Sequence, residues 1–287
     1  MGATKAYTDY QELLNDPEVD AVEIITPHYL HAPMGMEALE ARKHVSVQKP
    51  MATTMEECNE LIAVARRNDH MFRTFEKFQY YPPLVRAKEL LVSGAIGEPR
   101  SIRMKVILGT KEGWEIPYER WSWRFDPEKG SGGRIMLDYG SHLFAIALTS
   151  WAMWKKCSPG FLTLRFSMAG RPAVRPRSCG NTRTQRSTEA SKYVPEDEWF
   201  EITGSRGFIW VNRCSSMLLD APPVVVYRDG VTTNYSDMDT DWSTSFIAGC
   251  NEFVDCILAG RPARMTRKSS RCATVSNSLP ERVEKWC

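Results

Sequence analysis

Asp138 and His142 are the clearest candidates for chemistry, and they lie in the segment GSGGRIMLDYGSHLF, residues 130–144. A glycine-rich loop leads into a predicted helix there, and residues four apart project from one face of a helix. A carboxylate beside an imidazole can orient the ring and stabilise its protonated form, as a general acid or base requires. Taken alone, the segment is also compatible with an ordinary helix that carries an incidental histidine.

A second group of polar residues lies at the ends of two predicted strands in the N-terminal part of the chain, which must help to position these groups. The predicted strands are residues 21–26, 44–47 and 72–78, and the predicted helices are 7–15, 34–41 and 54–67, the last capped by Thr53 or Thr54. Strands that alternate with helices of this length indicate βαβ units and a parallel sheet. Ligands of such sheets bind at the carboxyl ends of the strands. The turns Thr26-Pro27-His28 and Gln48-Lys49-Pro50 are therefore expected at the functional edge.

The second half of the chain has a different pattern, which begins at Pro82-Pro83. Predicted elements are a helix at 84–92, strands at 99–108, 199–203, 208–212 and 224–228, and a helix at 246–258. Strands with little helix between them favour a mostly antiparallel sheet. We therefore expect an α/β chain with a parallel-sheet domain, residues 1–82, followed by an α+β domain, residues 83–287.

The strand-terminal Lys-Pro and the later Asp-x-Gly-x-His together resemble the glucose-fructose oxidoreductase / inositol dehydrogenase (Gfo/Idh/MocA) family. Here the two motifs are Gln48-Lys49-Pro50 and Asp138-Tyr139-Gly140-Ser141-His142. Weaker matches in the same order are DPEVDAV at 16–22 leading to Thr26-Pro27, His31-Ala32, EARKHV at 40–45 and GAIGEP at 94–99.

The resemblance implies an NAD- or NADP-dependent oxidoreductase that moves a hydride between the cofactor and a hydroxyl or keto carbon of a sugar, cyclitol or similar polyol. Lys49 would lie near the nicotinamide and the reacting oxygen, His142 would take the hydroxyl proton, and Asp138 would hold His142 or the substrate. The implied cofactor-binding residues are Thr26, Pro27, His28, His31, Gln48, Lys49 and Pro50. The resemblance also implies homo-oligomerisation through the open face of the second-domain sheet.

One residue departs from the family motif: Gln48 stands where the family has glutamate. A carboxylate that could pair with Lys49 is therefore missing, and an opposite charge nearby favours the charged form of a lysine. We expect the pH–rate profile to differ from that of a Gln48→Glu variant. Identical profiles would refute this prediction.

The dinucleotide fingerprint G-x-G-x-x-G, which should follow a first strand, is absent from the chain. We therefore expect residues 1–82 to be a partial Rossmann-like dinucleotide-binding domain that lacks its first βαβ unit, in an N-terminally truncated protein. The alternatives are an inactive truncated product or a non-catalytic binding protein on the same scaffold, and an NAD-dependent glycosidase-like hydrolase. Dinucleotide titration distinguishes the oxidoreductase from the inactive or binding protein. Product analysis, a ketone or a released sugar, distinguishes it from the hydrolase.

The formal net charge of +2 averages over unlike parts of the chain. Residues 139–188 contain eight Lys and Arg and no Asp or Glu, and together with residues 261–287 they carry a net +13, which leaves −11 for the rest. The basic segment could be an arm for an anionic partner. We favour out-of-frame translation of residues 150–190 and 265–287, because some codon choices restore family-like sequence after a two-base skip. Resequencing the gene tests this hypothesis.

The remaining features favour ordinary structural roles. We expect packing roles for Trp114, Trp121 and Trp123, with a lid over a sugar as the alternative. We expect structural or surface positions for His44 and His70. The eight cysteines lack metal-ligand spacing, and the chain shows neither a long apolar run nor a leader. We therefore expect a cytoplasmic protein with reduced thiols, no metal, no membrane span and no nucleic-acid partner.

Overall fold

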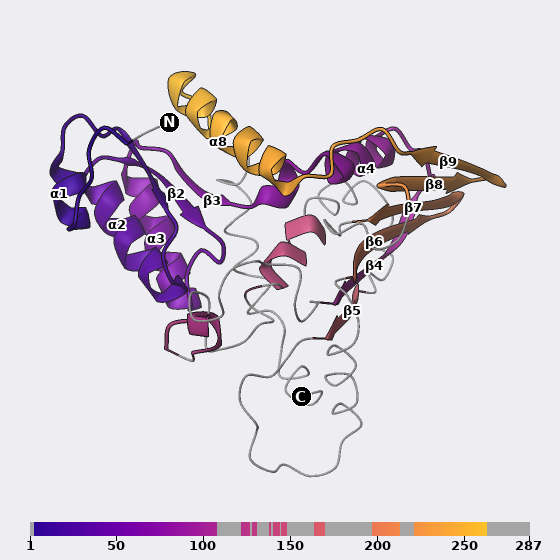
Figure 1. The fold of residues 1–287 in the computed structure, drawn as a ribbon, viewed down its shortest axis with the longest axis horizontal. Helices are drawn as coiled ribbons and strands as arrows, with labels where there is room; N and C mark the ends of the chain where they lie inside the picture. The colour runs from indigo at the N-terminus through magenta and orange to yellow at the C-terminus, as the bar shows by residue number, and fades with distance from the viewer. Residues whose placement is uncertain are drawn as a thin grey trace, which may run out of the picture. The chain divides into compact units, whose positions relative to one another are not determined.

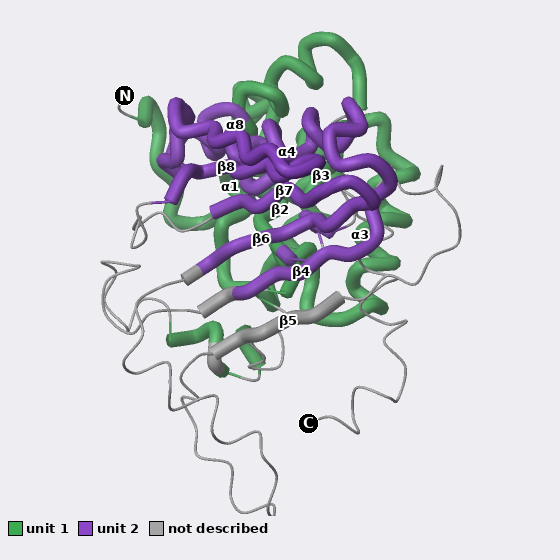
Figure 2. Tube along the Cα trace, turned by 90° about the vertical axis from the view of Figure 1, so that its right-hand side faces the viewer, with its two compact units in different colours: residues 1–76, 119–142, 249–286 green, residues 77–118, 143–248, 287 purple. Residues whose placement is uncertain are grey.

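The chain folds into two compact units, which Figure 2 shows in different colours. The structure is a computed structural model, and it describes residues 3–107, 122–126, 128–130, 138, 140–143, 145–147, 164–169, 197–212 and 221–262. The first unit comprises residues 1–76, 119–142 and 249–286. The second comprises residues 77–118, 143–248 and 287.

The units differ from the expected division after residue 82, because later segments of the chain return to the first unit. Residues 119–142 and the last part of α8 (Trp242–Leu258) belong with the N-terminal residues. Pro82 and Pro83 instead open α4 (Pro82–Val92), at a position where a missing N–H costs nothing. A local Pro-Pro signal marks a helix start and carries no information about which distant segments pack together.

The first unit contains a three-stranded parallel sheet in the order β1-β2-β3 (Figure 1). Its strands are β1 (Ala21–Ile24), β2 (His44–Gln48) and β3 (Phe72–Phe75). They alternate with α1 (Tyr10–Asn15), the short η1 (His28–Leu30), α2 (His31–Glu40) and α3 (Met55–Arg67). The predicted alternation of strands and helices is confirmed, and all three strands end at the same edge.

Helix α2 packs against β1 and β2 on one face of the sheet, and α3 packs against α2. Leu39, Leu61, Val45 and Val47 are fully buried in the core between these elements. A capping box opens α3: the Thr54 side chain accepts a hydrogen bond from the Glu57 N–H, and Glu57 accepts one from the Thr54 N–H. The start of α3 is thereby determined locally, close to the Lys49-Pro50 turn.

The other sheet face carries a buried arginine, Arg73 of β3. Its Nε donates to Ser46 Oγ at 2.8 Å, and its Nη1 donates to the Gly249 carbonyl of α8 at 2.7 Å. The guanidinium also lies 4.4 Å from the centroid of the Phe253 ring. Because successive strand residues face opposite sides, Ser46 and Arg73 hold the end of α8 on the face away from α2 and α3.

The second unit is built on a six-stranded sheet in the order β5-β4-β6-β7-β8-β9. The strands are β4 (Pro99–Ile107), β5 (Leu164–Ala169), β6 (Asp197–Gly204), β7 (Gly207–Asn212), β8 (Val224–Arg228) and β9 (Val231–Tyr235). All neighbouring pairs are antiparallel except β4 and β5. Helix α4 packs on β7 and β8. The predicted fold class is confirmed.

Two strands of this sheet were not predicted. The exposed β9 is joined to β8 by Asp229-Gly230, where both residues have positive φ, as a tight hairpin turn requires. β5 lies inside the basic segment whose reading frame the sequence calls into question. Trp114, Trp121 and the rest of residues 150–190 and 265–287 lie outside the described residues.

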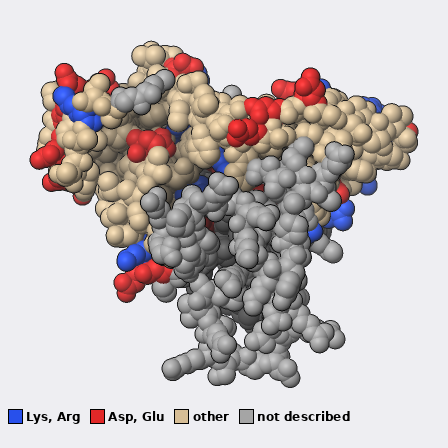
Figure 3. Space-filling view, in the orientation of Figure 1, with Lys and Arg blue, Asp and Glu red and all other residues tan. Residues whose placement is uncertain are grey.

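Figure 3 shows one face of the described residues, on which acidic and basic side chains are interspersed and acidic ones are the more prominent. This agrees with the net −11 of the sequence outside the two basic segments. Among the described helices, none combines the length and the apolar character that crossing a bilayer requires.

Candidate active site

Lys49 and Asp138 form a largely buried ion pair, although they lie 89 residues apart in the sequence. Lys49 follows the last residue of β2 and precedes a cis peptide bond to Pro50. Its ammonium donates to the carboxylate of Asp138 and, at 3.0 Å, to the backbone carbonyl of the same residue. Gln48 does not take this role, because its side-chain carbonyl accepts the Lys49 backbone N–H at 3.0 Å. Asp138 therefore supplies the negative charge that Gln48 lacks.

A second cation lies against the other oxygen of Asp138. Arg124 Nε is 3.1 Å from Oδ2, while Lys49 contacts Oδ1. Burial raises the pKa of the Asp138 carboxyl, but the charge and hydrogen bond of Lys49 and the charge of Arg124 outweigh it, so the net pKa is lowered. Asp138 is thus a carboxylate between two cations, which suits it to hold Lys49 in place.

His28 completes this cluster as a neutral ring. Its Nε2 lies 3.7 Å from Asp138 Oδ1, and its side chain is buried. Burial lowers the pKa of His28 to about 3, and the nearby charge of Asp138 only partly offsets this. The ring packs edge-on against Trp123, with centroids 4.7 Å apart. Among the three tryptophans singled out by sequence, Trp123 therefore packs on a site residue.

His31 joins the two turns that follow β1 and β2. Its Nδ1 lies 2.6 Å from the Pro50 carbonyl oxygen, and its Nε2 lies 2.9 Å from that of Thr26. The side chain is fully buried, and burial lowers its pKa despite these two carbonyl contacts. Carbonyl oxygens only accept hydrogen bonds, so the neutral His31 ring donates to one of the two carbonyls and only the protonated ring donates to both.

His142 is held by a carboxylate that the sequence did not indicate. Its Nδ1 lies 2.8 Å and 2.7 Å from the two oxygens of Glu76, which is 2% exposed. Asp138 and His142 are both helical, on successive turns of one face. Glu76 immediately follows β3, so the rule that indicated Lys49 and Thr26 also applies to it. The predicted strand 72–78 placed Glu76 inside the strand and hid this signal.

Most of the predicted site residues thus meet in the first unit, at the carboxyl edge of its sheet. Lys49, Asp138 and His28 form one cluster, and His142 lies one helical turn after Asp138, with Glu76. Pro27 precedes η1 and its carbonyl accepts the Leu30 N–H. The Thr26 hydroxyl is buried at the end of β1 without a hydrogen-bond partner among the described residues.

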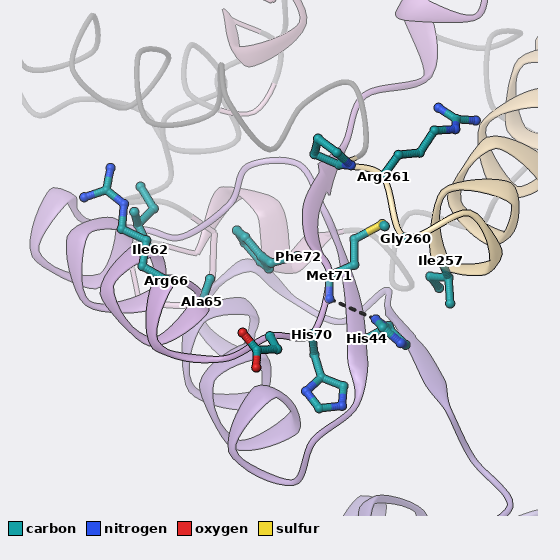
Figure 4. A pocket seen from close by; sticks show the side chains of 12 residues that line it. His44, Ile62, Ala65, Arg66, His70, Met71, Phe72, Ile257, Gly260 and Arg261 are labelled. Carbon is teal, nitrogen blue, oxygen red and sulfur yellow. Dashed lines mark hydrogen bonds between the residues drawn. The ribbon is translucent and has the colours of Figure 1, made fainter.

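A cavity of about 300 Å³ lies at the opposite edge of the same sheet, where β2 and β3 begin (Figure 4). Its lining includes His44, His70, Met71, Phe72, Arg66 and Arg261. His44 Nδ1 accepts the Met71 N–H at 2.9 Å, and the two histidine rings are 5.1 Å apart. None of the predicted catalytic residues lines this cavity, and the described residues contain no cluster suited to a metal ion.

Two family models match the chain, and both describe one family. The oxidoreductase model with an NAD-binding Rossmann fold matches residues 2–75, and the GFO/IDH/MocA C-terminal domain model matches residues 84–156. Together they span about half of the 287 residues. The chain belongs to the GFO/IDH/MocA oxidoreductase family, as the sequence motifs indicated.

Curated relatives match about half of the chain. An uncharacterized oxidoreductase of Synechocystis sp. is 34% identical over 139 residues, which cover 48% of this chain and 36% of that protein. The levoglucosan dehydrogenase of Pseudarthrobacter phenanthrenivorans is 28% identical over 148 residues, 51% of this chain and 37% of the relative. The matched segment therefore spans well under half the length of these relatives.

Solved structures share the fold over nearly the whole chain. An oxidoreductase domain protein from Kribbella flavida has a TM-score of 0.72 at 18% identity, covering 95% of this chain and 80% of that one. The 3-ketoreductase KijD10 from Actinomadura kijaniata, solved with NADP and TDP-benzene, has a TM-score of 0.65 at 22% identity, covering 94% and 80%. At these identities the likeness shows the fold alone.

Proposed function

We propose that this chain carries the catalytic groups of an NAD(P)-dependent oxidoreductase, which transfers a hydride between the cofactor and a hydroxyl or keto carbon of a sugar, cyclitol or similar polyol. The observation that carries the proposal is the largely buried Lys49–Asp138 pair, one helical turn from the His142–Glu76 pair, at the carboxyl ends of parallel strands. Ligands of open α/β sheets bind at this edge.

The residues present fit the nicotinamide end of such a cofactor. The buried Thr26 hydroxyl lies without a partner among the described side chains and backbone, at the end of β1, where it can bond a ligand amide. His28 is neutral and buried, so it adds no positive charge beside the ring. When bound, the nicotinamide ring supplies the hydride acceptor for oxidation or the donor for reduction.

The side chains divide the remaining work. Oxidation of an alcohol removes a hydride from carbon and a proton from oxygen, so a base must reach the hydroxyl. His142 takes this proton, and the Lys49 ammonium stabilises the negative charge that develops on the oxygen. Asp138, ionised between Lys49 and Arg124, keeps Lys49 in place. In the reverse direction His142 returns the proton.

Relatives support the substrate class. The levoglucosan dehydrogenase and the 1,5-anhydro-D-fructose reductase of Ensifer adhaerens, 28% and 29% identical to this chain, are both named for sugar derivatives. Among the three readings of the sequence, an oxidoreductase accounts for a paired lysine and a paired histidine at one edge. A non-catalytic binding protein requires neither pair.

The test is dinucleotide titration followed by turnover. Purified protein is titrated with NADH and NADPH, and then incubated with NAD⁺ or NADP⁺ and a panel of sugars, anhydrosugars and cyclitols. We expect saturable binding of one dinucleotide and formation of the reduced cofactor together with a ketone. Absence of dinucleotide binding, or release of a free sugar in place of a ketone, would overturn the proposal.

A further inference from the structure

We propose that Glu76 is the positioning residue of His142 and that it determines which ring nitrogen accepts the substrate proton. This inference rests on the proposed function, because it assigns a role within the same site. The carboxylate of Glu76 has both oxygens within 2.8 Å of His142 Nδ1, and both side chains are buried.

The geometry decides the tautomer of His142. An ionised carboxylate only accepts hydrogen bonds, so the contact requires a proton on Nδ1. A neutral imidazole has a proton on only one ring nitrogen, so the lone pair that can accept a proton is on Nε2. His142 can accept a substrate proton only at Nε2, on the side of the ring away from Glu76.

The same contact stabilises the product of the proton transfer. When Nε2 takes the hydroxyl proton, the ring becomes an imidazolium with its positive charge directly beside Glu76. A buried opposite charge at this distance favours the charged form. Glu76 thus does for His142 what Asp138 does for Lys49, and the two carboxylates of the site have separate tasks.

Asp138 is poorly placed to orient the His142 ring, because other groups already engage its carboxylate. Its two oxygens already lie against Lys49 and Arg124, whose combined effect lowers its pKa. A carboxylate engaged by two cations is a weak acceptor for a third group. Glu76, which comes from the end of the neighbouring strand β3, occupies the Nδ1 side of His142.

Nitrogen-15 NMR of the imidazole side chains tests the tautomer without any need for turnover. In the wild-type chain at neutral pH, we expect His142 to show a protonated Nδ1 and an unprotonated Nε2. His44 is an internal reference, because its Nδ1 accepts the Met71 N–H and its proton must therefore be on Nε2. If His142 shows the same pattern as His44, Glu76 is a donor or is absent from Nδ1, and the inference is overturned.

The Glu76→Gln variant tests the consequence for catalysis. A glutamine amide can donate to Nδ1, so we expect the proton of His142 to move to Nε2 while the signals of His44 stay unchanged. We expect kcat to fall at least about 100-fold with little change in KM, and Glu76→Asp, which keeps a carboxylate, to recover part of the loss. A Glu76→Gln variant with wild-type kcat would overturn the inference.

These measurements distinguish failure of the Glu76 inference from failure of the proposed function. An unexpected His142 tautomer overturns the role of Glu76, whatever the activity. The expected tautomer in a protein that binds no dinucleotide overturns the proposed function and leaves the geometry of the pair intact. If Glu76→Gln does not fold, the wild-type spectrum alone still decides the tautomer.

Discussion

The two edges of the three-stranded sheet show how differently one residue type can be used. At the carboxyl edge, His142 and His28 lie beside Glu76 and Asp138, within a set of buried charges. At the amino edge, His44 and His70 line an open cavity, and His44 bonds a backbone N–H. The edge with the cavity is thus not the edge with the paired charges. Burying charges costs stability, and perturbed ionisable groups cluster at functional sites, so the paired charges indicate the functional edge better than the cavity does.

The largest difference between the edges should appear in turnover. His142→Gln removes the proposed base, and we expect kcat to fall about 10²–10⁴-fold. The matched variant His44→Gln changes a histidine at the amino edge and should leave kcat unchanged. Steady-state kinetics with the best substrate of the panel measures both. Equal losses in the two variants would remove the distinction between the edges.

Stability should separate the edges next. Asp138→Asn leaves Lys49 and Arg124 beside a neutral side chain at a buried position, and breaking such a pair costs about 3–5 kcal/mol. Asp69→Asn is the control at the amino edge, where Asp69 is exposed and the change should stay within about 0.5 kcal/mol. Urea denaturation gives both values. Similar small losses of stability in both variants would mean that water, rather than Asp138, stabilises the charge of Lys49.

The pH dependence of stability gives a third contrast. The pKa of His28 is about 3 in the folded chain, below its ordinary value of 6.5, so the unfolded chain binds the proton first as pH falls. The contribution of His28 is therefore complete above pH 6.5 and is lost between pH 6.5 and about 3, at up to about 1.4 kcal/mol per pH unit. His31, whose pKa burial also lowers, acts with the same sign.

Urea titrations at several pH values check this contrast. His28→Gln should flatten the loss of stability on acidification. His44→Gln should flatten it less, because the His44 ring is only part-buried, although burial and the neighbouring His70 lower its pKa too. If His28→Gln leaves the slope unchanged, the ring is not buried as a neutral group.

The smallest effect concerns α3, which begins near the carboxyl edge and ends at the amino edge. Thr54→Ala removes the capping hydrogen bond to the Glu57 N–H and should cost about 1 kcal/mol. Asn68→Ala removes a single hydrogen bond to the Val64 carbonyl at the other end of the helix and should cost less. Thermal unfolding of both variants ranks them. The reverse ranking would show that the capping box contributes little.

Much of the site could be predicted from the sequence because strand ends can be recognised locally. Lys49 lies just after one predicted strand, Thr26 is the last residue of another, and Asp138 and His142 have a helical spacing. Glu76 was missed because β3 ends at Phe75, three residues before the predicted end. Arg124 was missed because nothing in its neighbourhood signals contact with Asp138. His31 was expected at the cofactor, and the structure places it between two backbone carbonyls.

The sequence by itself determined the alternation of strands and helices, a threonine cap at 53 or 54 and the family, because these depend on local periodicity, local hydrogen bonds and short motifs. Only the tertiary structure decided the pairing of charges. Asp138 lies 89 residues after Lys49, and His142 lies 66 residues after Glu76. Which carboxylate meets which cation depends on how the helix of Asp138 and His142 packs across the strand ends, and no local pattern encodes that packing.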